Sequence, residues 1–123
     1  MNPKVKIENN QGLAENRYNL GDKYWAAANL VAWCKEKNYP VFKLPLAAVN
    51  LAGMPWNVDD LDTFIWEMKR VNDADLKYPI ILDDFGRICD GYHRVCKAIL
   101  ENKTEIDAIR IEEMPRPDGY ERD

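Results

Sequence analysis

The chain has 123 residues, which suits one domain with a single core and is too short for two independent domains. Hydrophobic residues make up 46% of it and charged residues 31%, a balance typical of a soluble globular protein. The formal net charge of -4 argues against a surface that is basic throughout, as general nucleic-acid binding would need.

The sequence also predicts the compartment. No window approaches the roughly 20 consecutive apolar residues of a membrane span, and segment 1–10 is polar and lacks the apolar region of a signal peptide. We therefore expect an intracellular, cytoplasmic protein without a membrane partner. The cysteines Cys34, Cys89 and Cys96 are odd in number and form no Cys-x-x-Cys pair, which argues against disulfides and a zinc site.

The first half of the chain predicts an arm, a helix and a strand. Residues 1–20 are rich in asparagine and predict an irregular N-terminal arm with one short edge strand near 5–7. Apolar residues at helical spacing predict a helix over 22–37, which Asp22 can cap. A strand is expected over 41–46, because its apolar residues are nearly continuous.

The second predicted helix, over 58–71, has the clearest signal in the chain. It follows a loop at 50–57, and Asn57 can cap it. Its apolar residues repeat at i, i+3, i+4, i+7 and i+10, which is the pattern of an amphipathic helix. They are Leu61, Phe64, Ile65, Met68 and Val71.

The remaining segments complete a small mixed sheet. In chain order the expected elements are a buried strand at 79–82, a tight turn at 83–86, a return strand at 87–89, a helix at 93–101 and a strand at 106–111. The proline-containing tail at 115–123 is predicted to be loosely held. The sum is an α+β domain over 21–114, in which packed helices cover a small mixed sheet.

The motif Asp-Gly-Tyr-His-Arg at 90–94 stands at the predicted strand-to-helix junction. Gly91 allows a sharp turn and a close approach to a ligand, and the free N–H groups and dipole of a helix start favour an anion. His93 and Arg94 add side-chain donors, and Lys97 lies one turn further on the same face. These features predict a phosphate site whose natural ligand is a nucleotide.

Each of these residues also has a simpler interpretation. Asp90 can hold a metal-bound water, orient His93 or accept a ribose hydroxyl, but it can equally cap the helix. His93 and Arg94 can be solvated, or can pair with the turn residues Asp83 or Asp84.

Residues outside the motif add further candidates. Arg70 can line the mouth of the pocket or simply complement the dipole at a helix end. Trp56 can stack on a nucleotide base. The other tryptophans, Trp25, Trp33 and Trp66, fit either the core or a patch that faces a partner.

The segment 79–111 resembles the ParB/sulfiredoxin superfamily. The resemblance rests on Pro-Ile-Ile-Leu at 79–82, on Gly-Arg-Ile-Cys-Asp-Gly-Tyr-His-Arg at 86–94, and on Lys-Ala at 97–98 before a closing strand. With the preceding strand and helix it covers a core at 41–111. It implies a ParB/sulfiredoxin-like domain with an extra N-terminal helix, similar to small variants encoded by phages.

The resemblance also implies a ligand and roles for the motif. Members of the superfamily bind nucleotide phosphates at this junction, so it implies a nucleoside triphosphate, ATP or CTP, with Mg²⁺. It implies Asp90 and His93 as catalytic residues and Asp90 as the metal ligand. The residues that would bind phosphate or nucleotide there are Gly91, Tyr92, His93, Arg94 and Lys97, and the positions of Arg70 and Trp56 add these two to the set.

The chain departs from three branches of that superfamily. Tyr92 stands where sulfiredoxins carry their nucleophilic cysteine, and the loop at 50–57 lacks the glutamate of the serine-kinase branch. The Gly-Glu-Arg-Arg of partition proteins is absent from 90–94 as well.

Three functions stay open at this point. The first is nucleotide binding with phosphoryl transfer or nucleotide hydrolysis at 90–94. The second is a ParB-like nuclease or another DNA-binding activity that uses the same residues. The third is a non-catalytic protein of phage type that engages a host protein through its tryptophans and N-terminal arm. Whether the chain is an enzyme is not decided by these patterns.

Overall fold

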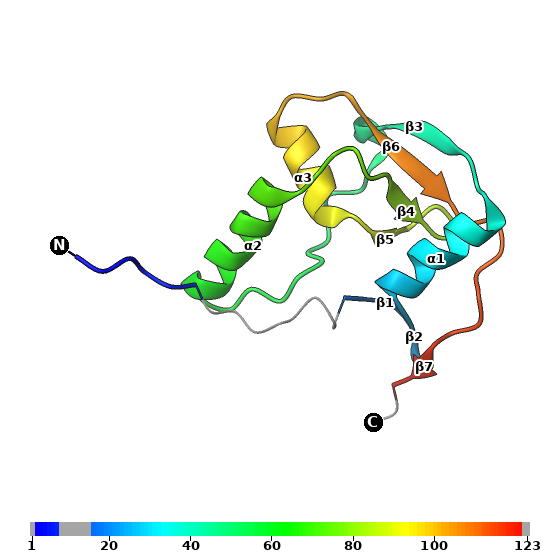
Figure 1. The fold of residues 1–123 in the computed structure, drawn as a ribbon, viewed down its shortest axis with the longest axis horizontal. Helices are drawn as coiled ribbons and strands as arrows, with labels where there is room; N and C mark the ends of the chain where they lie inside the picture. The colour runs from blue at the N-terminus through cyan, green and yellow to red at the C-terminus, as the bar shows by residue number, and fades with distance from the viewer. Residues whose placement is uncertain (1, 8–15, 122–123) are drawn as a thin grey trace.

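The computed structural model describes residues 2–7 and 16–121, and this part of the chain is α+β with three α-helices and two small sheets (Figure 1). The elements are β1 (Arg17–Leu20), β2 (Lys23–Ala26), α1 (Ala27–Lys37), β3 (Val41–Pro45), a 3-10 turn (Leu46–Ala48), α2 (Leu61–Asp73), β4 (Ile80–Leu82), β5 (Ile88–Asp90), α3 (Tyr92–Leu100), β6 (Glu105–Arg110) and β7 (Gly119–Tyr120). None of the helices within these residues has the length and apolar character that crossing a membrane requires.

The larger sheet is mixed, as predicted, with strand order β3-β6-β4-β5. β4 pairs with β6 in parallel, whereas β3–β6 and β4–β5 are antiparallel. Ile80 and Leu82 pack with α3 in one hydrophobic cluster, while Ile81 packs with α1 in the other. Both faces of β4 are therefore buried, which explains its uninterrupted apolar sequence.

The smaller sheet, in the order β1-β2-β7, replaces part of the predicted first helix. That helix was expected over 22–37, but 23–26 is β2, and α1 begins at Ala27. Gly21 has a φ of +63°, which allows the tight hairpin between β1 and β2. The strand buries Trp25 in the hydrophobic cluster that contains Ile81. Residues 2–7 form no regular element, so the edge strand predicted near 5–7 is absent.

The segment that follows Met114 has defined contacts, although the sequence predicted a loosely held tail at 115–123. The indole of Trp25 donates to Pro115 O at 2.8 Å, and β7 pairs with β2. Asp118 accepts hydrogen bonds from Ala26 N at 2.7 Å and from Asn29 Nδ2 at 2.9 Å. Asp22, the predicted cap, makes no side-chain bond to the α1 start, so a distant carboxylate satisfies this end of the helix.

Helix α2 differs from its prediction in two ways. It begins at Leu61 instead of 58, and Asp60, not Asn57, caps it by accepting from Thr63 N at 2.7 Å. Of the five apolar residues at helical spacing only Val71 is buried, while Leu61, Phe64, Ile65 and Met68 are exposed. The helix packs on α3 through another side, which includes the buried Glu67.

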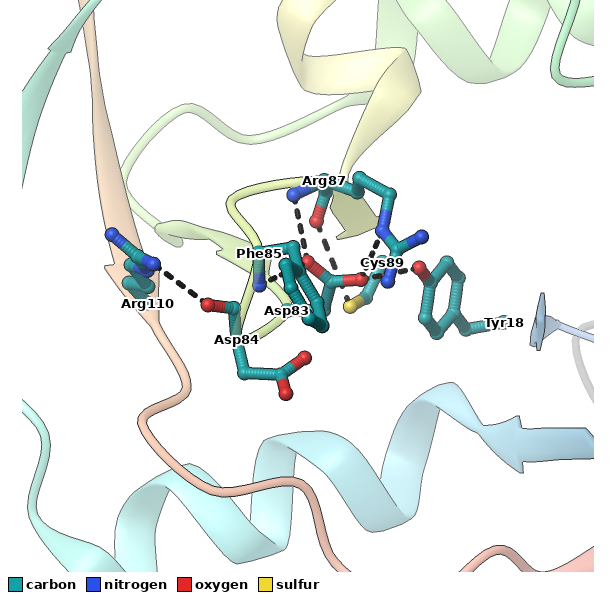
Figure 2. A network of polar contacts seen from close by, with 7 residues as sticks. All are labelled: Tyr18, Asp83, Asp84, Phe85, Arg87, Cys89 and Arg110. Carbon is teal, nitrogen blue, oxygen red and sulfur yellow. Dashed lines mark hydrogen bonds and ion pairs between the residues drawn. The ribbon is translucent and has the colours of Figure 1, made fainter.

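Asp83 joins the two sheets through the β4–β5 turn (Figure 2). Its buried carboxylate accepts from Tyr18 Oη at 2.6 Å, from Phe85 N at 2.9 Å, and from Arg87 N and Nε at 2.8 and 2.7 Å. Burial alone would raise the pKa of Asp83, but these hydrogen bonds outweigh it and lower the pKa. The turn at 83–86 was predicted from the sequence, but the hydrogen bond from Tyr18 of β1 was not.

Candidate functional site

A cleft of about 640 Å³ lies where the two sheets meet the start of α3. Most of its lining comes from β1 and the residue before it, from the loop that precedes α2, from α2 itself and from the β5–α3 junction, and Ala27 and Glu121 complete it. The motif residues Asp90, Gly91, Tyr92 and His93 lie in its wall, together with Trp56 and Arg70. Six residues predicted from the sequence as site residues are thus brought together.

Gly91 makes the junction possible. Its φ is +115°, in the left-handed region that side chains disfavour, and it immediately precedes the first residue of α3. A Cβ at this position would lie 2.5 Å from Ile80 Cγ2 and 3.1 Å from Arg94 Nη2. The backbone can therefore turn sharply and leave the first N–H groups of α3 at the cleft.

His93 is paired with Glu67, a residue that was not among the predicted site residues. His93 Nε2 and Glu67 Oε2 are 2.6 Å apart, and their side chains are only 15% and 6% exposed. The ring of Trp56 stacks on the imidazole, with centroids 4.2 Å apart and an interplanar angle of 22°. His93 is therefore held on two sides, by a carboxylate and by an aromatic ring.

Burial lowers the pKa of His93, and the nearby Arg70 and Arg94 lower it further, while Glu67 opposes the shift. The imidazole is consequently neutral near pH 7. Because a carboxylate only accepts hydrogen bonds, the proton of this neutral ring resides on Nε2, and Nδ1 carries the lone pair. Such a ring can accept a proton from a bound group.

Arg94 and Asp90 form a second pair. Arg94 Nη2 donates to Asp90 Oδ2 at 2.8 Å, and Nη1 donates to the carbonyl oxygens of Tyr78 and Pro79 at 3.0 and 2.8 Å. Arg94 thus ties α3 to the segment that leads into β4. The motif predicted that Arg94 binds phosphate, and in the structure these two nitrogen atoms bond to protein acceptors.

The other predicted cations differ in position. Lys97 Nζ donates to Asn72 O at 2.9 Å and to Ala74 O at 2.7 Å, so it satisfies the end of α2 and does not line the cleft. Arg70 lines the cleft, and within the described residues its guanidinium has no hydrogen-bond or ion-pair partner. Arg17 also lines the cleft and pairs with Glu121 at 3.2 Å.

Two further side chains line the wall and are poorly suited to act as nucleophiles. Burial raises the pKa of the Cys89 thiol and of the Tyr92 hydroxyl, so both remain protonated at neutral pH. Cys89 packs in the hydrophobic cluster that also contains Trp25 and Ile81.

The donor set fits Mg²⁺ only as an ion shared with a ligand. Within the described residues, no group of three or more histidines, cysteines, aspartates or glutamates could hold a metal ion. Mg²⁺ is commonly bound by one or two carboxylates together with substrate phosphates and water. Asp90 can supply one such carboxylate, since Arg94 bonds to only one of its oxygens.

Glu67 could have been found from its position in the helix. It lies three residues after Phe64 and four before Val71, on one border of the apolar stripe. A charged residue there, in a chain with a single histidine, signals a buried pair. The contribution of β1 to the cleft had no comparable signal, because segment 17–20 was assigned to the arm.

Comparisons with protein families, with curated protein sequences and with solved structures find no match for this chain. The resemblance to the ParB/sulfiredoxin superfamily therefore stays a prediction from the sequence at 79–82, 86–94 and 97–98.

Proposed function

We propose that the cleft binds a nucleotide by its phosphates and that His93 is the base for attack of water or a hydroxyl group on phosphorus. The single observation that carries the proposal is the His93–Glu67 pair, buried in the wall of a cleft at the start of α3. A polar pair that costs desolvation and faces a cavity is typical of a functional site.

Phosphate binding is supported by what surrounds the pair. The N–H groups at the start of α3 and the guanidinium of Arg70 offer donors of the kind that phosphate oxygens accept. Gly91, with its φ of +115°, makes the turn that brings this helix start to the wall of the cleft. The bonds of Arg94 to Pro79 O and to Asp90 hold the junction in shape.

The pair supports proton transfer in a defined direction. The attacking oxygen gives its proton to Nδ1 of His93 and forms a bond to phosphorus, while the bridging P–O bond breaks and its electrons leave with the diphosphate. The imidazolium that forms is stabilised by the Glu67 carboxylate at Nε2. When Mg²⁺ is bound with the nucleotide it neutralises phosphate charge, and Asp90 is the residue that would hold it.

The binding prediction is tested by thermal unfolding with ATP or CTP and Mg²⁺. At a ligand concentration of about 100 times Kd, binding should stabilise the fold by about 2.7 kcal/mol. Arg70→Ala should weaken binding about tenfold or more, because it removes a charged hydrogen-bond donor. Lys103→Ala, at an exposed lysine outside the cleft, is the control and should leave the shift unchanged.

No stabilisation by any common nucleotide would contradict the proposal. If DNA rather than a nucleotide is the ligand, a gel shift should appear that weakens steeply as salt increases. That result would favour the alternative of a nucleic-acid-acting protein.

The proton-transfer prediction is tested by the pH profile of phosphate release. Because His93 must be neutral to act as a base and its pKa is lowered, activity should fall on the acid side only below the usual histidine value of about 6.5. Glu67→Gln removes the group that raises the His93 pKa, so the acid limb should move to lower pH and kcat should fall about 10- to 100-fold. If the acid limb of the pH profile stays at the same pH in Glu67→Gln, then His93 is not the group that titrates.

A further inference from the structure

One face of α2 is apolar and exposed. Leu61, Phe64, Ile65 and Met68 are between 39% and 71% exposed, and their spacing places them along one side of the helix. We call these four residues the α2 outer face. Figure 1 shows α2 at the edge of the molecule, beside α3. An exposed stripe of large apolar side chains marks an interaction surface.

The α2 outer face is not what attaches the helix to the protein. The attachment uses Val71, the bond between Glu67 and His93, and the bonds from Lys97 to the carbonyl groups at the end of the helix. At about 100° per residue, Arg70, which lines the cleft, lies on a different side of the helix from Ile65. A partner on the α2 outer face would therefore leave the cleft accessible.

The charges beside this face suit a second copy of the chain. Asp62 and Lys69 are seven residues apart, two helical turns, so they flank the face on the same side. Neither has an ion-pair partner within the described residues. When two such helices pack antiparallel about a two-fold axis, Asp62 of each copy lies opposite Lys69 of the other, so the pair forms twice.

We propose that two copies of the chain associate through antiparallel packing of their α2 outer faces. The contact is isologous, because the same patch is used by both copies. One helix face from each copy makes a small interface, so we expect a weak dimer with a Kd on the order of micromolar. The proposal is independent of what the cleft binds.

The experiment is sedimentation velocity of the full chain over a concentration series. Phe64→Ser should raise the dimer Kd about tenfold or more, because it removes an aromatic contact from the middle of the face. Phe85→Ser is the matched control, since Phe85 is 77% exposed in the β4–β5 turn, and it should leave the Kd unchanged. Circular dichroism checks that both variants fold.

Charge reversal tests the orientation. Asp62→Lys alone and Lys69→Asp alone should each raise the Kd about three- to tenfold, because each places like charges opposite one another twice. The double variant Asp62→Lys/Lys69→Asp should restore the original Kd. A chain that stays monomeric at all concentrations overturns the proposal. A dimer Kd that Phe64→Ser leaves unchanged also overturns it. So does a double variant whose dimer Kd is as high as that of the single variants.

Discussion

Asp83→Ala should lower the free energy of unfolding by about 3–5 kcal/mol, the largest effect that we expect from one side chain. The carboxylate is fully buried and accepts four hydrogen bonds, from the Tyr18 hydroxyl, the Phe85 amide, and the amide and guanidinium of Arg87. Removing it leaves these donors without their acceptor, and each buried unpaired donor costs about 1–3 kcal/mol. Chemical denaturation with urea measures the loss.

Asp84→Ala is the matched control for this prediction. Asp84 follows Asp83 in the same turn, but its bond to Arg110 uses its backbone oxygen, which the substitution keeps. We expect its free energy of unfolding to differ from that of the unchanged chain by no more than about 0.5 kcal/mol. Tyr18→Phe should lower the free energy of unfolding by an amount between those of the two alanine variants. It removes only the hydrogen bond that links β1 to the turn (Figure 2). Equal losses for Asp83→Ala and Asp84→Ala would mean that the buried hydrogen bonds are not the cause.

Gly91→Ala should destabilise the fold by about 3 kcal/mol and lower Tm by roughly 10 °C. The methyl group would lie 2.5 Å from Ile80 Cγ2, in a strand where both faces are packed, and the φ of +115° disfavours any side chain. Because Ile80 is fully buried, it has little room to move away. Differential scanning calorimetry measures the change in Tm.

Gly53→Ala serves as the control for Gly91→Ala. Gly53 has no atom within 4 Å of the position that a Cβ would take, and its φ is not in the left-handed region. The substitution should be neutral or stabilise by up to about 1 kcal/mol, because it restricts the unfolded chain. If Gly91→Ala is as well tolerated as Gly53→Ala, then the close approach to Ile80 does not constrain the junction.

Local signals in the sequence were sufficient to predict much of the larger sheet and the helix that follows it. The continuous apolar run at 79–82, the turn residues after it and the helical spacing after Gly91 predicted β4, β5 and α3 within one or two residues. Each of these signals comes from neighbouring residues, whose conformations depend mainly on local sterics and on burial.

The errors in the first helix and its surroundings lie where a distant segment decides the outcome. Segment 22–26 has apolar residues at helical spacing, yet Lys23–Ala26 is a strand, because β1 and β7 pair with it on either side. The start of α1 is satisfied by Asp118, far along the chain, instead of by Asp22. No pattern within 22–37 contains that information.

In the candidate site, too, some features follow from the sequence and others only from the tertiary structure. The sequence by itself determined an α+β chain with a glycine turn and a helix start at 90–94, since these follow from spacing and from the conformational freedom of Gly91. Only the tertiary structure decided the distant partners. Glu67 bonds to His93, the carbonyl groups of Tyr78 and Pro79 accept from Arg94, and Lys97 donates to the end of α2. The physical reason is that hydrogen bonds depend on atoms a few ångströms apart in space, and α2 meets α3 only when both pack beside the sheet.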